Sequence, residues 1–260
     1  MHAFTQLSIE YASQRSYLDD LFRVYPTIPE GIREIDTQKW ERVELFFEEQ
    51  NNPELLSALL EFDLFPIKDS YVAYLRRDPT AIRRNPQTVN RICGRLYEMG
   101  LNEIYRKCSE AKETNRQMGP MFRSWLAKGS LGLFPVELTD FVSTTDNAIL
   151  AGSDHVLATF ATDYLNYSHS KGLDFVLRFN GRYVIGEAKF LTDFGGHQNA
   201  QFNDAITTAK THNVNALIIA VLDGVLYIKG NNKLYREIAT THAGLPIMSA
   251  LVLREFLYQL

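Results

Sequence analysis

Three ionisable side chains interrupt a strongly apolar stretch in the second half of the chain. The stretch runs from Gly172 to Phe190 (GLDFVLRFNGRYVIGEAKF), and the three residues are Asp174, Glu187 and Lys189. Carboxylates and an ammonium group set among apolar residues carry a large desolvation cost unless a counter-charge compensates them. A divalent cation such as Mg²⁺ is the obvious compensation, because hard cations take carboxylate oxygens as ligands. These residue types therefore indicate a metal-assisted site.

Two antiparallel strands must position these side chains. Asn180-Gly181 lies between two apolar runs, and this pair favours a two-residue hairpin turn because both positions tolerate positive φ. Side chains alternate between the faces of a strand, so Glu187 and Lys189 share one face. The alternative is a buried ion pair between these two residues, or a hairpin with one solvated face. The predicted strands cover residues 173–179 and 182–190.

The order of these residues, an acid, twelve residues and then Glu-x-Lys on a hairpin, resembles the PD-(D/E)xK nuclease superfamily, in particular the type II restriction endonucleases. Leu173 stands where the family motif has proline. The resemblance covers residues 150–222 and extends to the rest of the chain by analogy. It implies an α/β (mixed α+β) fold, a restriction-endonuclease-like core with a central mixed β-sheet flanked by helices, preceded by a helical N-terminal region.

The resemblance also implies a role for each residue of the motif. Asp174 and Glu187 would hold one or two Mg²⁺ ions, with the Ala188 carbonyl as a further metal ligand. Lys189 would orient or deprotonate the attacking water and stabilise the transition state. The expected reaction is cleavage of double-stranded DNA at specific sequences by a homodimer.

A predicted helix precedes the motif, and in the family this helix often lends another acid to the metal site. Ser153 is its expected N-cap, and Asp154 in its first turn is the candidate acid, with Asp163 behind it. The alternative for Asp154 is a favourable interaction with the helix dipole. The loop and helix after the second strand hold four further candidates for contact with DNA or the scissile phosphate: Asp193, His197, Gln198 and Gln201.

Charge is distributed unevenly along the chain, although the net charge is only −4. Residues 1–67 hold 5 basic and 13 acidic residues, whereas residues 68–128 hold 13 basic and 6 acidic residues. Such asymmetry fits either a basic face for a polyanion or an ordinary solvated helical surface, and the resemblance to the nucleases favours the basic face. Arg, Asn and Gln can pair with base edges, and Arg also contacts phosphates. The DNA-contact candidates in this segment are Arg83, Arg84, Arg91, Arg95, Asn115, Arg116, Gln117 and Arg123.

Length and composition set the domain organisation. The 260 residues and 45% hydrophobic content predict one large or two small globular domains. We expect a helical N-terminal region over residues 1–128, with the basic part at 68–128 on DNA, and a catalytic core over 129–260. Two cysteines without a CxxC spacing fit a reducing prokaryotic cytoplasm, and neither a signal peptide nor a membrane span is expected.

Three other functions remain open from the sequence. One is a DNA repair or mobile-element nuclease with the same core, and another is a non-catalytic DNA-binding module whose acid and lysine are structural. The third, an enzyme on a Rossmann-like sheet, lacks the glycine-rich phosphate loop that this fold requires.

Overall fold

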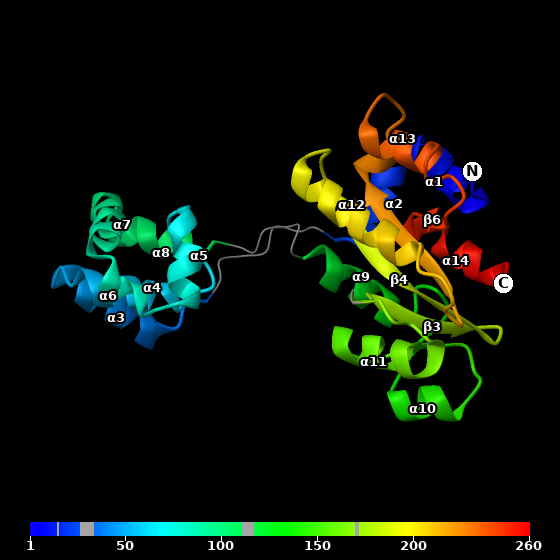
Figure 1. The fold of residues 1–260 in the computed structure, drawn as a ribbon, viewed down its shortest axis with the longest axis horizontal. Helices are drawn as coiled ribbons and strands as arrows, with labels where there is room; N and C mark the ends of the chain where they lie inside the picture. Colours follow the sequence, from blue (N-terminus) through cyan, green and yellow to red (C-terminus); the bar gives the residue numbers. More distant parts are fainter. Residues whose placement is uncertain (15, 27–33, 111–116, 170–171) are drawn as a thin grey trace. The chain divides into compact units, whose positions relative to one another are not determined.

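A computed structural model of the protein (Figure 1) describes residues 1–14, 16–26, 34–110, 117–169 and 172–260. The chain divides into two compact units. Unit 1 comprises Met1–Thr27 and Glu113–Leu260, and unit 2 comprises Ile28–Lys112. Each unit has hydrophobic core residues of its own. Unit 2 is therefore an insertion between the N-terminal helices of unit 1 and the rest of that unit.

Unit 1 is built on a mixed β-sheet, which has six strands within the described residues and the order β1-β2-β3-β4-β5-β6. The pairs β2/β3 and β3/β4 are antiparallel, and the other neighbouring pairs are parallel. The predicted mixed sheet flanked by helices is confirmed. The strands are β1 (Pro135–Val136), β2 (Ala148–Leu150), β3 (Phe175–Phe179), β4 (Arg182–Leu191), β5 (Leu217–Gly224) and β6 (Ile247–Met248).

The predicted hairpin is present as β3 and β4. Asn180 and Gly181 both have positive φ, at 49° and 73°, which matches the right-handed twist of the strands they join. Phe179 therefore pairs with Arg182 directly across the turn. The sequence VLYIKG at residues 225–230 predicts a further strand, but this prediction is wrong, because the chain turns there into a short 3₁₀ helix, η2 (Val225–Tyr227).

Helices cover both faces of the sheet. Phe175 of β3 packs with Phe122 of α9 (Met118–Ala127), whereas the next residue, Val176, packs in a cluster with Phe160 of α11 (Asp154–Leu165). This alternation follows from the two-residue period of a strand. Helix α12 (Gly196–Ala209) lies along β4 and β5 (Figure 1). The other helices of unit 1 are α1 (Ala3–Ala12), α2 (Tyr17–Val24), α10 (Leu138–Ser143), α13 (Lys233–Ala239) and α14 (Ala250–Tyr258).

The N-terminal helices α1 and α2 belong to the sheet unit, which differs from the division expected after residue 128. Buried hydrogen bonds explain why. The Thr5 hydroxyl donates to the Ile247 carbonyl at 2.6 Å, and the Tyr25 hydroxyl donates to the Asp223 carboxylate at 2.9 Å. Helix α9 also packs on β4. The insertion thus begins and ends within the region expected to be one helical domain.

Unit 2 is helical in its described part, as expected. Asp36 caps its first helix by accepting a hydrogen bond from the Lys39 backbone at 3.1 Å, and α7 begins at Pro86, where the missing N–H costs nothing. The helices are α3 (Thr37–Glu48), α4 (Asn52–Leu60), α5 (Ser70–Arg77), α6 (Ala81–Arg84), α7 (Pro86–Met99) and α8 (Leu101–Cys108).

Cys93 and Cys108 are both buried and free. No helix in the described part of the chain has the length and apolar character needed to cross a membrane.

A buried carboxylate, Asp223, ties three elements of unit 1 together. It lies at the end of β5 with no exposed surface. It accepts hydrogen bonds from Tyr25 after α2, from the Ser249 hydroxyl at the N-cap of α14, and from the Ala250 backbone. Burial raises the pKa of Asp223 from 3.8 to about 6, although these hydrogen bonds oppose the shift. The native protein therefore binds this proton more tightly than the unfolded chain does.

We predict that Asp223 makes unit 1 less stable as the pH rises from about 4 to 6. The native state binds more protons than the unfolded state over this window, so the free energy of unfolding falls by up to about 3 kcal/mol. Asp223→Asn is neutral at every pH and lacks this loss. Urea unfolding at several pH values should show the stability difference shifting in favour of the variant between pH 4 and 7. A difference that is independent of pH would contradict the prediction.

Candidate active site

The hairpin places Asp174 beside the end of β4. The Asp174 backbone N–H donates to the Gly186 carbonyl at 2.9 Å, one step before β3 begins. The Asp174 carboxylate in turn accepts a hydrogen bond from the Ala188 backbone at 2.8 Å. The carboxylate is therefore held by the backbone of the strand that carries the other two ionisable residues.

The structure brings the three predicted side chains into direct contact. Lys189 Nζ lies 2.9 Å from Asp174 Oδ2 and 3.1 Å from Glu187 Oε2. The Asp174 and Glu187 side chains are only 15% and 6% exposed, and Lys189 is 26% exposed. Two nearly buried carboxylates thus converge on one cationic group at an opening to solvent.

Gly186 lets β4 approach β5 closely just before Glu187. A Cβ atom at this position would lie 2.0 Å from the Ile219 carbonyl oxygen, which is far inside van der Waals contact. Any other residue would push the two strands apart. The glycine therefore keeps β4 and β5 close together at the point where the Glu187 side chain leaves the strand.

Helix α12 holds Glu187 from the other side of its carboxylate. The Thr208 hydroxyl, which is fully buried, donates to Glu187 Oε1 at 2.6 Å. Tyr167, also buried, lies next to this pair. Burial raises the pKa of Tyr167, and the negative charge of Glu187 raises it further. The hydrogen bond between Tyr167 and Thr208 acts in the opposite direction and lowers this pKa. Sequence reasoning missed Thr208, because nothing local links a threonine on a helix to a carboxylate 21 residues earlier.

The charge of Lys189 follows from its surroundings. Burial by itself lowers the pKa of this ammonium group, but the adjacent carboxylates of Asp174 and Glu187 raise it by a larger amount. The net pKa lies above the ordinary lysine value, so Lys189 is positively charged at neutral pH.

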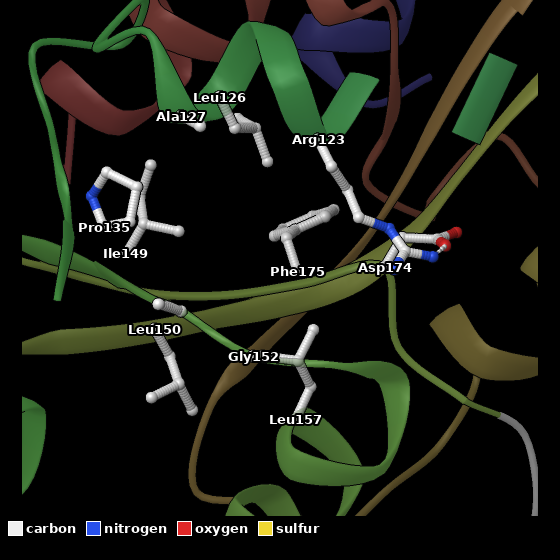
Figure 2. Close-up of a pocket in the computed structure, with 11 residues that line it drawn as sticks. Arg123, Leu126, Ala127, Pro135, Ile149, Leu150, Gly152, Leu157, Asp174 and Phe175 are labelled. Carbon is white, nitrogen blue, oxygen red and sulfur yellow. Dashed lines mark ion pairs between the residues drawn. The ribbon is translucent and has the colours of Figure 1, made fainter. Parts of the chain in front are cut away.

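A second cation, Arg123 of α9, approaches the same cluster. Its guanidinium group lies 2.8 Å from Asp154 Oδ1 and 3.6 Å from Asp174 Oδ1. Figure 2 shows the Arg123 side chain reaching Asp174 beside Phe175, at the edge of a cavity of about 220 Å³ lined mainly by apolar side chains. Arg123 was expected among DNA contacts, and the structure places it at the motif residues.

Asp154 and Asp163 lie in different surroundings on α11. Asp154 begins the helix and pairs with Arg123, but its side chain is 64% exposed. Asp163 is exposed farther along the helix. Ser153 occupies the N-cap position as expected, although its side chain makes no capping hydrogen bond.

The donor set suits a hard cation. Asp174 and Glu187 present carboxylate oxygens to one point, and such oxygens are what Mg²⁺ takes, together with waters. Among the residues that the structure describes, no group of three or more His, Cys, Asp or Glu side chains gathers as a metal cluster. A metal here would therefore be held by two carboxylates, with backbone carbonyl or water oxygens completing its shell.

Of the four candidates after β4, Gln198 is bound to its own loop. The buried Gln198 amide contacts Thr192, accepting from its backbone at 3.3 Å and donating to its hydroxyl at 3.2 Å. These two hydrogen bonds connect the loop after β4 to α12. They occupy both polar atoms of the Gln198 side chain, which was expected to reach a phosphate. Asp193 and His197 are exposed to solvent, and the half-buried Gln201 contacts the His197 ring at 3.3 Å.

Most of the basic candidates in unit 2 already have acidic partners. Arg84 pairs with Asp78 at 2.5 Å, and Arg91 and Arg95 each pair at 2.6 Å, with Asp69 and Glu98. Arg83 is exposed and forms no ion pair within the described residues.

The remaining DNA-contact candidates lie after unit 2 in the sequence. Gln117 lies at the N-cap position of α9. Two further candidates, Asn115 and Arg116, lie outside the residues that the structure describes.

Comparison with known proteins identifies a family that covers nearly the whole chain. A family model described as "Tsp45I type II restriction enzyme" matches residues 2–260. Neither the curated proteins nor the solved structures contain a significant match to the chain.

We predict that Thr208→Val destabilises the protein by about 1–3 kcal/mol, because the buried Glu187 oxygen loses its donor. Thr207→Val is the matched control, since the Thr207 hydroxyl is exposed and donates only to the Asn203 carbonyl within the same helix. Chemical unfolding of both variants measures the difference. Equal stability of the two variants would rule out this role for Thr208.

Proposed function

The chain belongs to the Tsp45I type II restriction enzyme family, which makes it a site-specific deoxyribonuclease, and from this premise we propose how it acts. It hydrolyses phosphodiester bonds in double-stranded DNA in a Mg²⁺-dependent reaction. The convergence of Asp174 and Glu187 on Lys189 is the observation that carries this proposal. With the family shown, the repair-nuclease and binding-module alternatives fall away.

The metal would be held by Asp174 and Glu187, with the Ala188 carbonyl as a further ligand. When bound, it would lower the pKa of a coordinated water and offset charge that grows on the phosphate. Lys189 orients the attacking water with its N–H groups and stabilises the negative charge of the pentavalent transition state. Thr208 keeps Glu187 in one orientation, so that its second oxygen faces the reaction.

Water supplies the oxygen that bonds to phosphorus, and the bond from phosphorus to the leaving sugar oxygen breaks. Cutting both strands of a duplex requires two such events. The described residues hold one site of this kind, so we infer a homodimer with two-fold symmetry on its target. The free, buried cysteines agree with action in a reducing prokaryotic cytoplasm.

We predict that Asp174→Ala, Glu187→Ala and Lys189→Ala each reduce Mg²⁺-dependent cleavage by about 10³-fold or more, because the three side chains act as one unit. Single-turnover cleavage of plasmid or phage DNA measures the loss, and circular dichroism checks the fold. Glu255→Gln, an exposed carboxylate on α14, is the control and should cleave normally. Near-normal cleavage by a folded Lys189→Ala protein would overturn the assignment.

The cations of unit 2 best able to contact DNA are those without an acidic partner among the described residues. Arg77 and Arg83 are exposed and form no ion pair or hydrogen bond within the described residues. Tyr71 and Tyr74 of α5 are 61% and 60% exposed, and with Arg77 they follow a three-residue spacing along one side of the helix. Exposed aromatic and basic side chains together suit contact with sugars, bases and phosphates. We infer that this side of α5 and Arg83 contact the duplex.

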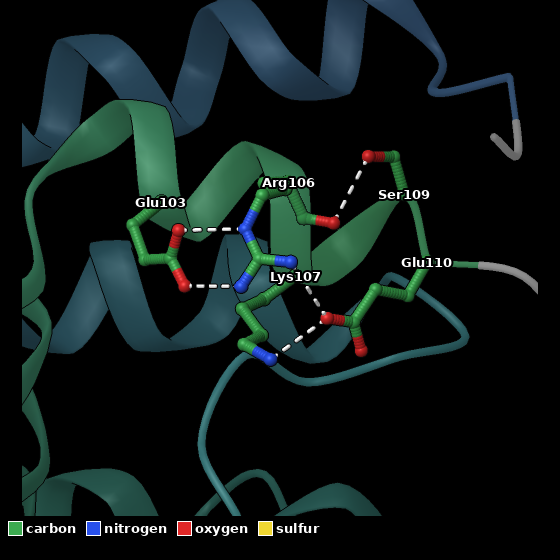
Figure 3. Close-up of polar contacts among 5 residues, drawn as sticks. All are labelled: Glu103, Arg106, Lys107, Ser109 and Glu110. Atoms are coloured by element: carbon green, nitrogen blue, oxygen red, sulfur yellow. Dashed lines mark hydrogen bonds and ion pairs between the residues drawn. The ribbon is translucent and has the colours of Figure 1, made fainter.

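The paired arginines would contribute less to affinity. Arg84, Arg91 and Arg95 each have an acidic partner that cancels their charge, although such exposed pairs are worth only about 1 kcal/mol or less and DNA could displace them. Arg106 and Lys107 on α8 are held in the same way by Glu103 and Glu110, as Figure 3 shows. These two provide a charge-matched comparison.

We predict that Arg77→Gln combined with Arg83→Gln lowers the slope of log affinity against log salt by about two units, because two phosphate contacts are lost. Arg106→Gln combined with Lys107→Gln removes the same charge and should change the slope much less. Binding titrations with duplex DNA at several salt concentrations measure both. Equal effects from the two double variants would show that DNA senses only net charge, and unit 2 would have no preferred face.

A further inference from the structure

Asp174 faces a different protein cation with each of its two carboxylate oxygens. Lys189 contacts Oδ2 at 2.9 Å, and Arg123 approaches Oδ1 at 3.6 Å. Arg123 lies on α9, 51 residues before Asp174 in the sequence. Figure 2 shows its side chain directed at Asp174. The Arg123 guanidinium therefore lies next to an oxygen that a metal would use.

The two cations are held with unequal strength. Lys189 contacts both Asp174 and Glu187 at normal hydrogen-bond distances. Arg123 makes one close contact, with the exposed Asp154, and is 39% exposed itself. Its Nε atom is buried and has no hydrogen-bond partner among the described residues. Arg123 is thus the easier cation to move from Asp174.

Charge balance gives a reason for such a movement. Asp154, Asp174, Glu187, Arg123 and Lys189 together carry one net negative charge. A divalent ion would turn this into one positive charge and would lie within a few ångströms of the guanidinium, which is repulsive. One phosphodiester would restore neutrality and offer the guanidinium a new partner, because arginine pairs readily with phosphate oxygens.

We propose that Arg123 is a displaceable internal cation, which competes with the metal for Asp174 in the free protein and transfers to a DNA phosphate when metal and DNA bind together. The proposal rests on the proposed function. Arg123 then acts as a positioning residue that couples the two ligands. Each ligand should strengthen the binding of the other by the same factor.

The test is calorimetric titration of DNA-free protein with Ca²⁺, which takes the same oxygen ligands as Mg²⁺. Arg123→Met keeps the apolar stem beside Phe175 but removes the charge, and it should bind Ca²⁺ about tenfold more tightly than the natural protein. Arg123→Lys keeps the charge and should bind Ca²⁺ like the natural protein. Arg254→Met, an exposed arginine on α14, controls for a general loss of positive charge.

The second readout is the factor by which Ca²⁺ tightens duplex DNA binding, which should shrink in Arg123→Met. If Arg123 only supports the local structure, its replacement would leave Ca²⁺ affinity unchanged or weaken it, and the proposal would be wrong. Should Arg123→Met fail to fold, Arg123→Gln is titrated in its place. A natural protein that neither binds the metal nor cleaves DNA would instead refute the proposed function.

Discussion

Two nearly buried carboxylates that must be compensated by positive charge dominate this protein. The Glu187 side chain is 6% exposed, and its charge is stabilised by Lys189 on one oxygen and by the Thr208 hydroxyl on the other. Leaving such a carboxylate without partners would be strongly destabilising. The close approach of β4 and β5 at Gly186 and the docking of α12 both serve to keep these partners in place. The same electrostatic demand is the reason for proposing a divalent ion at this site.

A second buried carboxylate, Asp223, holds distant segments of unit 1 together through the hydrogen bonds that it accepts. Its hydrogen bonds join the chain after α2 to the start of α14, although these segments are far apart in the sequence. Since hydrogen bonds to a buried carboxylate are costly to break, the N-terminal helices are bound to the sheet unit. Unit 2 is consequently an inserted module with its own core, and the charge asymmetry of the chain falls mainly within it.

Ion pairs reduce the number of cations in unit 2 that are available to bind DNA. A segment that is rich in arginine along the sequence presents few uncommitted cations, because acids on the same or neighbouring helices neutralise most of them. One of the remaining cations, Arg77, shares one side of α5 with two exposed tyrosines, Tyr71 and Tyr74. Local net charge therefore indicates a nucleic-acid surface only together with the partner of each side chain.

The sequence by itself determined the hairpin and its charged residues. Asn180-Gly181 specifies a turn whose register follows from strand alternation, and the spacing of Asp174, Glu187 and Lys189 then places them on neighbouring strands. These are local rules, so they need no knowledge of the rest of the chain. The mixed sheet with flanking helices followed from the family resemblance.

Only the tertiary structure decided which distant residues complete the site. Thr208 and Arg123 reach the carboxylates from helices whose positions depend on core packing, and no local pattern links either residue to these carboxylates. The same holds for the boundary of the inserted unit, which is set by buried hydrogen bonds between residues more than 190 positions apart. Long-range contacts of this kind depend on how the packed elements meet, and that geometry is absent from any short window of sequence.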